Sequence, residues 1–282
     1  MWPPVVDPGM ANALGKLGIW SGTVSPELAV EVEKLGYGAV WVGSSPDGNL
    51  NVIENLLDAT ERVVVATGIV NVWKDDAATV SASYHRIVAR HPGRFLLGVG
   101  IGHPEAAKEY RKPYDKIVEY LDQLDEAGVP VADRALAALG PKMLKLAGER
   151  TAGAHPYLTT PEHTRRAREL LGDGPLLAPE HKVVLDTDPA RARALGRETI
   201  KFPYLKLSNY VSNWRRLGFT DEDFADDGSD RLIDSMVAWG TPESIAARLN
   251  EHLEAGADHV CVQALGDDPL AAYRAVASVL LT

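Results

Sequence analysis

Short apolar runs recur along the chain and are separated by amphipathic segments of helical length. The runs show no strict alternation of apolar and polar residues, which is typical of strands buried on both faces of a sheet. We predict eight such strands, at Lys16–Trp20, Ala39–Val42, Val63–Ile69, Phe95–Val99, Arg134–Leu139, Gly153–Tyr157, Lys182–Leu185 and His259–Ala264.

The intervening segments carry signals for the start of a helix. A serine, threonine or aspartate stands directly before a proline at Ser25, Thr160, Asp188, Thr241 and Asp268. Such a side chain can accept a hydrogen bond from an unpaired helical N–H. Strand and helix alternate eight times, which predicts a parallel sheet closed into a (β/α)8 TIM barrel. A doubly wound open sheet is the alternative, but no Gly-x-Gly-x-x-Gly motif follows the first strand.

The stretch from about residue 202 to residue 239 interrupts this alternation. It is rich in aromatic and charged residues and is longer than an ordinary connection. We predict a helical insertion before the last βα unit, which either caps the barrel or forms a lid or a dimer contact. The chain contains no linker, so we predict that residues 1–282 form a single domain, and a homodimer is one expected state of it.

The chain is acidic, with 29 lysines and arginines against 39 aspartates and glutamates, a net charge of 29 − 39 = −10. This charge disfavours binding to nucleic acids and to anionic membranes. No apolar stretch reaches the length of a membrane span and the N-terminus lacks a signal-peptide pattern, so we expect a cytoplasmic protein. Cys261, the single cysteine, lies in an apolar run and is expected to be a buried thiol.

In a TIM barrel the reacting groups lie at the carboxyl ends of the strands. No two histidines have the spacing of metal ligands and no Ser/His/Asp motif is present, so we expect no metal site and no hydrolase triad. The segment Leu97-Gly-Val-Gly-Ile-Gly-His103 leaves the fourth strand with three glycines at alternate positions. The missing side chains clear one face for a flat ring, although tight packing at the barrel rim is the more ordinary explanation.

Three motifs, in their order and spacing, resemble the luciferase-like superfamily of flavin and deazaflavin oxidoreductases. They are Gly36-Tyr-Gly-Ala-Val-Trp-Val42, Ala66-Thr-Gly-Ile-Val-Asn71 and Gly93-Arg-Phe-Leu-Leu-Gly-Val-Gly100. Four further segments resemble one actinobacterial subfamily of F420-dependent oxidoreductases: Ala137-Ala-Leu-Gly-Pro-Lys-Met143, Gly153-Ala-His-Pro-Tyr157, Asn213-Trp-Arg-Arg-Leu-Gly-Phe219 and Ala255-Gly-Ala-Asp-His-Val-Cys-Val-Gln263. The resemblance covers nearly the whole chain.

The resemblance assigns cofactor-binding roles to individual residues. In deazaflavin members of the family the third strand ends in a bulge with a non-prolyl cis peptide behind the tricyclic ring, which here would be Gly68–Ile69, followed by Asn71. The glycines of the fourth strand, Gly100 and Gly102, would flank the edge of the ring. The phosphate-bearing tail of the cofactor would reach Gly140, Lys142, Ala152, Gly153 and His155.

Two departures from the family concern the substrate. Sugar-phosphate dehydrogenases of the family carry a histidine after the second strand, where this chain has Ser44-Ser-Pro-Asp47. They also carry a glutamate after the glycines of the fourth strand, where this chain has His103. Both differences argue against a sugar-phosphate substrate. Because histidine titrates near neutrality, His103 is our candidate for a catalytic acid or base.

The expected function is hydride transfer between coenzyme F420 and a small organic substrate. One alternative is a luciferase-like monooxygenase that uses flavin mononucleotide (FMN) on the same barrel. A second alternative, from a different class, is a protein that binds the cofactor without turnover.

Overall fold

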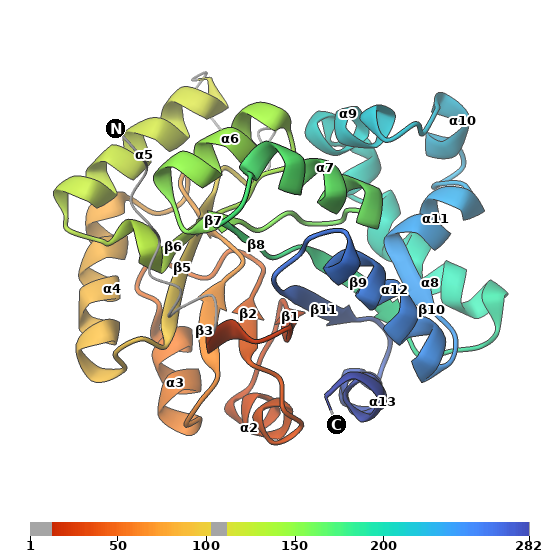
Figure 1. The fold of residues 1–282 in the computed structure, drawn as a ribbon, viewed down its shortest axis with the longest axis horizontal. Coiled ribbons are helices and arrows are strands. Elements are labelled where there is room, and N and C mark those ends of the chain that lie inside the picture. Colours follow the sequence, from red (N-terminus) through yellow and green to blue (C-terminus); the bar gives the residue numbers. More distant parts are fainter. Residues whose placement is uncertain (1–12, 103–111, 282) are drawn as a thin grey trace.

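The computed structural model describes residues 13–102 and 112–281. The strands form one parallel sheet that curls into a barrel, and helices surround it (Figure 1). The strands are β1 Leu17–Ser21, β2 Ala39–Val42, β3 Val64–Thr67, β4 Val70–Asn71, β5 Phe95–Gly100, β6 Arg134–Leu136, β7 Gly153–Ala154, β8 Leu176–Leu177, β9 Glu180–Val184, β10 Val237–Trp239 and β11 Val260–Ala264. The α-helices are α2 Pro26–Lys34, α3 Asn51–Ala59, α4 Ala77–Arg90, α5 Pro113–Glu126, α6 Pro141–Arg150, α7 Pro161–Leu171, α8 Pro189–Lys201, α9 Ser208–Arg216, α10 Asp221–Phe224, α11 Asp230–Met236, α12 Pro242–Glu254 and α13 Pro269–Leu280. Two short 3-10 helices are η2 Val131–Asp133 and η3 Tyr204–Lys206.

The barrel closes through one continuous segment of chain. β8 pairs with β7, and β9 pairs with β11, while only Ala178 and Pro179 separate β8 from β9. Hydrogen bonds bridge this junction on both sides, because Ala178 N donates to Ala154 O at 2.9 Å and Cys261 N donates to Pro179 O at 2.8 Å. The predicted barrel is therefore confirmed, and residues 176–184 together form its seventh strand.

Several strands differ from the prediction. β6 ends at Leu136 rather than at Leu139, and β7 ends at Ala154 rather than at Tyr157. The seventh strand begins at Leu176 rather than at Lys182, and Pro179, which has no N–H to donate, interrupts its ladder and made the first part resemble a loop. β10 was not predicted. It pairs with β9 in parallel register, outside the closed ring of strands.

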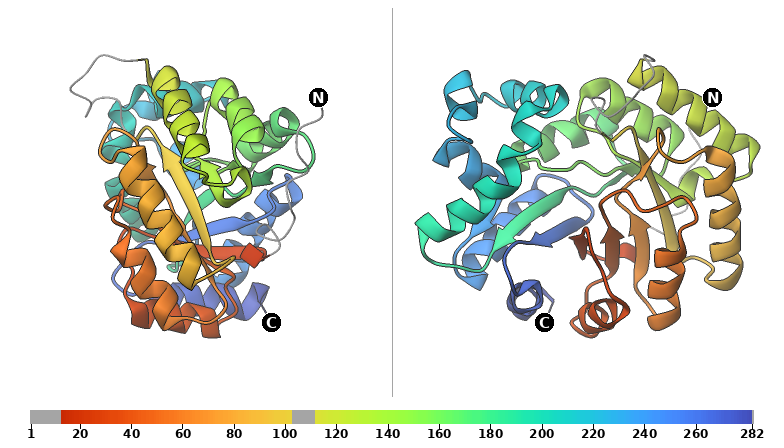
Figure 2. Two further views of the ribbon diagram at one scale, coloured as in Figure 1. Left: turned by 90° about the vertical axis from the view of Figure 1, so that its left-hand side faces the viewer. Right: turned by 180° about the vertical axis from the view of Figure 1, so that it is seen from behind.

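The predicted insertion is mostly helical, with η3, α9, α10 and α11 in succession, but it ends in β10 and is not helical throughout. Its helices gather beside α8 at one side of the barrel (Figures 1 and 2). They form a separate apolar cluster around Trp214, Leu232, Ile233 and Met236, which also contacts Ile200 of α8. The insertion therefore has a core of its own.

All five predicted capping residues cap a helix. The side chains of Ser25, Thr160, Asp188, Thr241 and Asp268 each accept a hydrogen bond from a backbone N–H in the first turn of the helix that follows. Proline occupies the start of each of these helices, where its missing N–H leaves no partner unpaired.

The two faces of the strands bury different side chains. Their outer faces pack aliphatic residues such as Val40, Val65 and Leu97 against the helices. Their inner faces fill the barrel with two tryptophans, Trp20 and Trp41, next to small residues and Cys261. The small residues leave room for the large rings, namely Ala39, Ala66, Ala135 and Ala178.

Candidate active site

A cavity of about 490 Å³ opens at the mouth of the barrel, beside the carboxyl ends of the strands. Among the residues that the structure describes, no aspartate, glutamate, lysine or arginine lines this cavity. The lining residues are Trp20, Ser44, Ser45, Gly68, Ile69, Asn71, Ile101, Gly102, Ala137, Ala138, Leu139, Gly140, Met143, His155, Tyr157, Pro203, Tyr204, Asn209 and Tyr210.

Six of the predicted cofactor-binding residues meet in this cavity. They are Gly68, Ile69, Asn71, Gly102, Gly140 and His155. The predicted cis peptide bond between Gly68 and Ile69 is present. Gly100 lies directly behind the lining, because a β-carbon built there would be 2.9 Å from both Ile69 and Ala137. With Ala137 and Ala138, the four lining residues Gly68, Ile69, Gly102 and Gly140 form what we call the glycine wall.

Three predicted cofactor-binding residues lie elsewhere. The exposed side chain of Lys142 places its Nζ 3.6 Å from the centre of the Tyr114 ring. Ala152 and Gly153 lie at the opposite, amino end of β7, and a β-carbon on Gly153 would be 1.9 Å from Leu176 O. The backbone of β8 thus leaves no room for a ligand at Gly153. His103, the predicted catalytic residue, lies outside the described residues and stays a prediction.

His155 forms the floor of the cavity, and neighbours hold its ring on two sides. Trp41 stacks on it with the ring centres 4.2 Å apart and the planes 16° from parallel. His155 Nδ1 lies 2.7 Å from Ala178 O, and because a carbonyl oxygen can only accept, Nδ1 must carry the proton. Burial lowers the pKa of His155 to about 4, so the ring is neutral at physiological pH.

The opposite side of the cavity is aromatic, and we call Tyr157, Tyr204, Asn209 and Tyr210 the tyrosine wall. The ring centres of Tyr157 and Tyr204 are 5.6 Å apart, and those of Tyr204 and Tyr210 are 4.9 Å apart. Burial raises the pKa of each of the three phenols, which therefore keep their protons at neutral pH. The sequence did not predict this wall, because three of its four residues come from the insertion.

A fully buried ion pair lies behind Tyr157. Lys182 Nζ is 3.0 Å from Glu180 Oε1, and it donates a second hydrogen bond of 3.0 Å to Gln263 Oε1. The same oxygen accepts from the hydroxyl of Tyr157 at 2.9 Å, and the ammonium lies 4.0 Å from the centre of the Tyr157 ring. Burial raises the pKa of Glu180 and lowers that of Lys182, and the opposite charge of the partner works against each shift. This network fixes the position of Tyr157.

Arg216 brings a positive charge to the rim of the cavity. A β-carbon built on Gly140 would lie 3.7 Å from Arg216 Nη2, which donates to Asn213 Oδ1 at 3.1 Å. Gly140 also precedes helix α6, and its carbonyl oxygen accepts hydrogen bonds from Met143 N and Leu144 N at 3.0 Å each. Arg216 was present in a motif that resembles the family, but sequence alone did not show that the end of α9 returns to Gly140.

A second hollow of about 850 Å³ adjoins this cavity and shares Ser44 with it. It is an open groove between the loops that follow β1 and β2. Within residues 13–102 and 112–281, no group of three or more His, Cys, Asp or Glu side chains could hold a metal ion. Over the same ranges, none of the helices combines the length and the apolar character needed to cross a membrane.

Comparison with known proteins shows what this chain is similar to. A family model described as luciferase-like monooxygenase matches residues 24–128. The F420-dependent secondary alcohol dehydrogenase, solved with an F420-acetone adduct, superposes on 95% of this chain and 98% of its own with a TM-score of 0.71 and 18% sequence identity. This is the luciferase-like fold.

Luciferase-like proteins with either cofactor resemble the chain. The 5,10-methylenetetrahydromethanopterin reductase of Methanolobus tindarius is 22% identical over 81% of this chain and 86% of that protein. The oxygenating constituent of 3,6-diketocamphane monooxygenase from Pseudomonas putida, solved with FMN, covers 93% of this chain and 97% of its own with a TM-score of 0.66 and 16% identity. The luciferase-like fold is thus compatible with a deazaflavin and with a flavin.

Proposed function

We propose that this luciferase-like chain is an oxidoreductase that transfers hydride between coenzyme F420 and a small, predominantly apolar organic substrate. The observation that carries the proposal is the cavity between the glycine wall and the tyrosine wall, whose described side chains carry no charge. A flat, neutral ring suits such a space, because it buries apolar surface without leaving a side-chain charge unpaired.

The residues present fit a ring with an anionic tail. The glycine wall presents backbone rather than side chains, so a ring can approach it closely. Arg216 offers a positive charge beside Gly140 at one end of the cavity, where the tail would lie. Lys142, which the sequence assigned to the tail, is directed at Tyr114 instead.

F420 supplies the hydride chemistry when bound, and the chain supplies position and a dry environment. The tyrosine wall and Trp20 exclude water from the space beside the ring. The phenols of this wall hold their protons firmly, because burial raises the pKa of each one. A proton that follows the hydride therefore needs a group that titrates near neutrality, and we propose His103 for this role.

Similar proteins of both cofactor classes bear on the choice, and two of them support F420. The sequence relative is a reductase of the methanopterin type, and one similar structure contains an F420 adduct. A monooxygenase with FMN has a similar fold, however, and this observation favours FMN as the second candidate. The actinobacterial subfamily remains a prediction from the sequence motifs.

Titration of the purified protein with F420 and FMN side by side tests the proposal. We expect saturable binding of F420 at a lower dissociation constant than that of FMN. Reduced F420 should then transfer hydride to a substrate panel without consuming oxygen. Tighter binding of FMN with oxygen consumption would instead establish the monooxygenase, and binding of F420 with no turnover would establish a binding protein.

Replacing His103 by alanine should lower turnover by roughly a hundredfold while the dissociation constant of F420 stays nearly constant. Loss of the acid or base should also remove one limb of the pH–rate profile near neutrality. Unchanged turnover with a true substrate would show that the proton comes from another group.

A further inference from the structure

His155 has one ring nitrogen without a hydrogen-bond partner. The side chain is 2% exposed and lines the cavity, yet its Nε2 atom bonds to no atom of the described residues. Buried polar atoms are nearly always paired, so an unpaired one at a cavity needs an explanation. The cavity itself offers it, because a ligand there can supply the missing partner.

The surroundings determine what kind of partner is missing. Nδ1 donates its proton to Ala178 O, which leaves Nε2 with a lone pair that can only accept. Rotating the ring by half a turn would lose this hydrogen bond, and the flat packing against Trp41 holds the ring in its plane. Protonation of Nε2 is disfavoured because burial lowers the pKa of His155 to about 4.

One donor close to this nitrogen is already used. Trp20 Nε1 donates to Gly68 O at 3.2 Å. Gly68 is also a neighbour of His155, since a β-carbon built on it would be 3.2 Å from His155 Nε2. Among the described residues, Nε2 is thus an acceptor without a donor, and a ligand in the cavity can bring the donor.

We propose that His155 Nε2 accepts a hydrogen bond from an N–H or O–H group on the buried edge of the bound ring, and so helps to select the ligand. The proposal rests on the proposed function, in which a deazaflavin or flavin occupies the cavity. In its oxidised form the ring of this deazaflavin carries two such donors, the imide N–H and the ring hydroxyl, whereas the ring of an oxidised flavin carries only the imide. A phosphate oxygen would face the lone pair of Nε2 unfavourably, so this role differs from the contact with the cofactor tail that the sequence predicted.

The test combines changes in the protein with changes in the ligand. The proteins are the wild type, His155→Leu, His155→Gln and the control His163→Leu. His163 is a matched control because it is also buried and its Nδ1 is also unpaired among the described residues, but it does not line the cavity. The ligands are F420, F420 methylated at the imide nitrogen and F420 methylated at the ring hydroxyl, and fluorescence titration gives each dissociation constant.

We expect His155→Leu to raise the dissociation constant of F420 roughly ten- to a hundredfold, because the ligand donor then lacks its partner. His155→Gln should lose less, since its amide oxygen can accept, and His163→Leu should bind as the wild type does. Methylation of the donor that meets His155 should weaken binding to the wild type and have little further effect on His155→Leu. Sensitivity to imide methylation identifies the imide, and sensitivity to hydroxyl methylation identifies the hydroxyl.

The ionisation state of the ring hydroxyl of bound F420 is a second measurement. A purely structural role of His155 would leave this ionisation state unchanged. If the hydroxyl is the donor, the absorption spectrum of bound F420 should be that of the protonated form in the wild type, and this feature should vanish in His155→Leu. Equal affinities of the wild type and His155→Leu for F420 would overturn the proposal. So would methylation effects that are the same in both proteins, even if His155→Leu is less stable. Failure of the wild type to bind either F420 or FMN would instead overturn the proposed function.

Discussion

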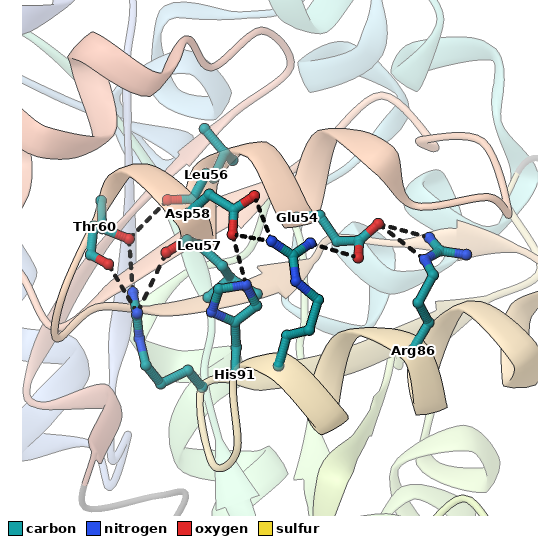
Figure 3. Close-up of polar contacts among 9 residues, drawn as sticks. Glu54, Leu56, Leu57, Asp58, Thr60, Arg86 and His91 are labelled. Carbon is teal, nitrogen blue, oxygen red and sulfur yellow. Dashed lines mark hydrogen bonds and ion pairs between the residues drawn. The ribbon is translucent and has the colours of Figure 1, made fainter.

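The first half of the barrel, from β1 to α5, and the second half, from β6 to α13, place their charged groups differently. In the first half, helices α3 and α4 are joined on the outside by an ion-pair network in which Glu54 contacts Arg86 and Arg90, and Asp58 contacts Arg90 and His91 (Figure 3). In the second half, the Glu180–Lys182 pair lies inside the barrel with both side chains 0% exposed.

The histidines follow the same division. The exposed His85 belongs to the first half, whereas the five histidines that are buried among the described residues belong to the second. The latter are His155, His163, His181, His252 and His259. The comparison teaches that the first half is an aliphatic framework, while the second half carries buried polar groups whose energies depend on their partners.

Lowering the pH should have the largest effect on the free energy of unfolding, and the buried histidines of the second half should cause it. Burial lowers the pKa of His155, His163 and His259 to about 4 and that of His252 to about 3. In the unfolded chain these groups have their ordinary pKa near 6.5, so the unfolded state binds protons that the folded state does not. The free energy of unfolding should have its full value above about pH 6.5. It should decrease as the pH falls toward about 4, by about 1.4 kcal/mol per pH unit for each histidine.

Denaturant unfolding at a series of pH values measures this slope. Replacing His252 by glutamine should make the slope shallower, whereas replacing the exposed His85 by glutamine should leave it as it is. Equal slopes for the two variants would contradict the proposed difference between the two halves.

Lys182→Met should have the next largest effect. It leaves Glu180 buried without its cation, which typically costs about 3–5 kcal/mol of unfolding free energy. Adding Glu180→Leu to the same chain should recover much of the loss, because no uncompensated charge then remains. If the double variant is as unstable as the single one, the ion pair is not the source of the effect.

The third prediction tests whether the insertion contributes to binding of the cofactor tail. Arg216→Ala should weaken F420 binding roughly fivefold, or about 1 kcal/mol, since the guanidinium is partly exposed and screened. Lys142→Ala is the matched control, because Lys142 is a cation at the start of α6, next to Gly140, but lies over Tyr114. The difference should shrink as salt is added. A larger effect at Lys142 than at Arg216 would return the tail to the position that the sequence predicted.

The outer network of the first half should give the smallest effect. Glu54→Gln removes the shared partner of Arg86 and Arg90, but both arginines are largely exposed. We expect a loss of less than about 1 kcal/mol in the free energy of unfolding, and still less in high salt. A loss as large as that of Lys182→Met would contradict the comparison.

The sequence predicted the framework better than the site. Caps, apolar runs and the Gly68–Ile69 bond are local features. The five caps and the cis bond are present in the structure, and each of the eight predicted runs overlaps a strand of the barrel, although some of the bounds differ. The tyrosine wall and its support depend on contacts between distant residues, such as the bond from Tyr157 to Gln263, which lies 106 positions along the chain. No local pattern reports such a contact. Arg216 was missed for the same reason, since its approach to Gly140 depends on the path of the whole insertion.

The junction between β8 and β9 limits where residues can be inserted into this chain or deleted from it. Along residues 176–184 every second side chain faces the barrel interior, including Ala178, Glu180 and Lys182, while His181 faces α12 and contacts His252. One residue inserted after Pro179 would turn β9 over, directing both charges at the helices and His181 into the barrel. Insertions and deletions should therefore be absent from this segment among related chains, whereas the turn at Asp173 and Gly174, outside the ladder, should tolerate them.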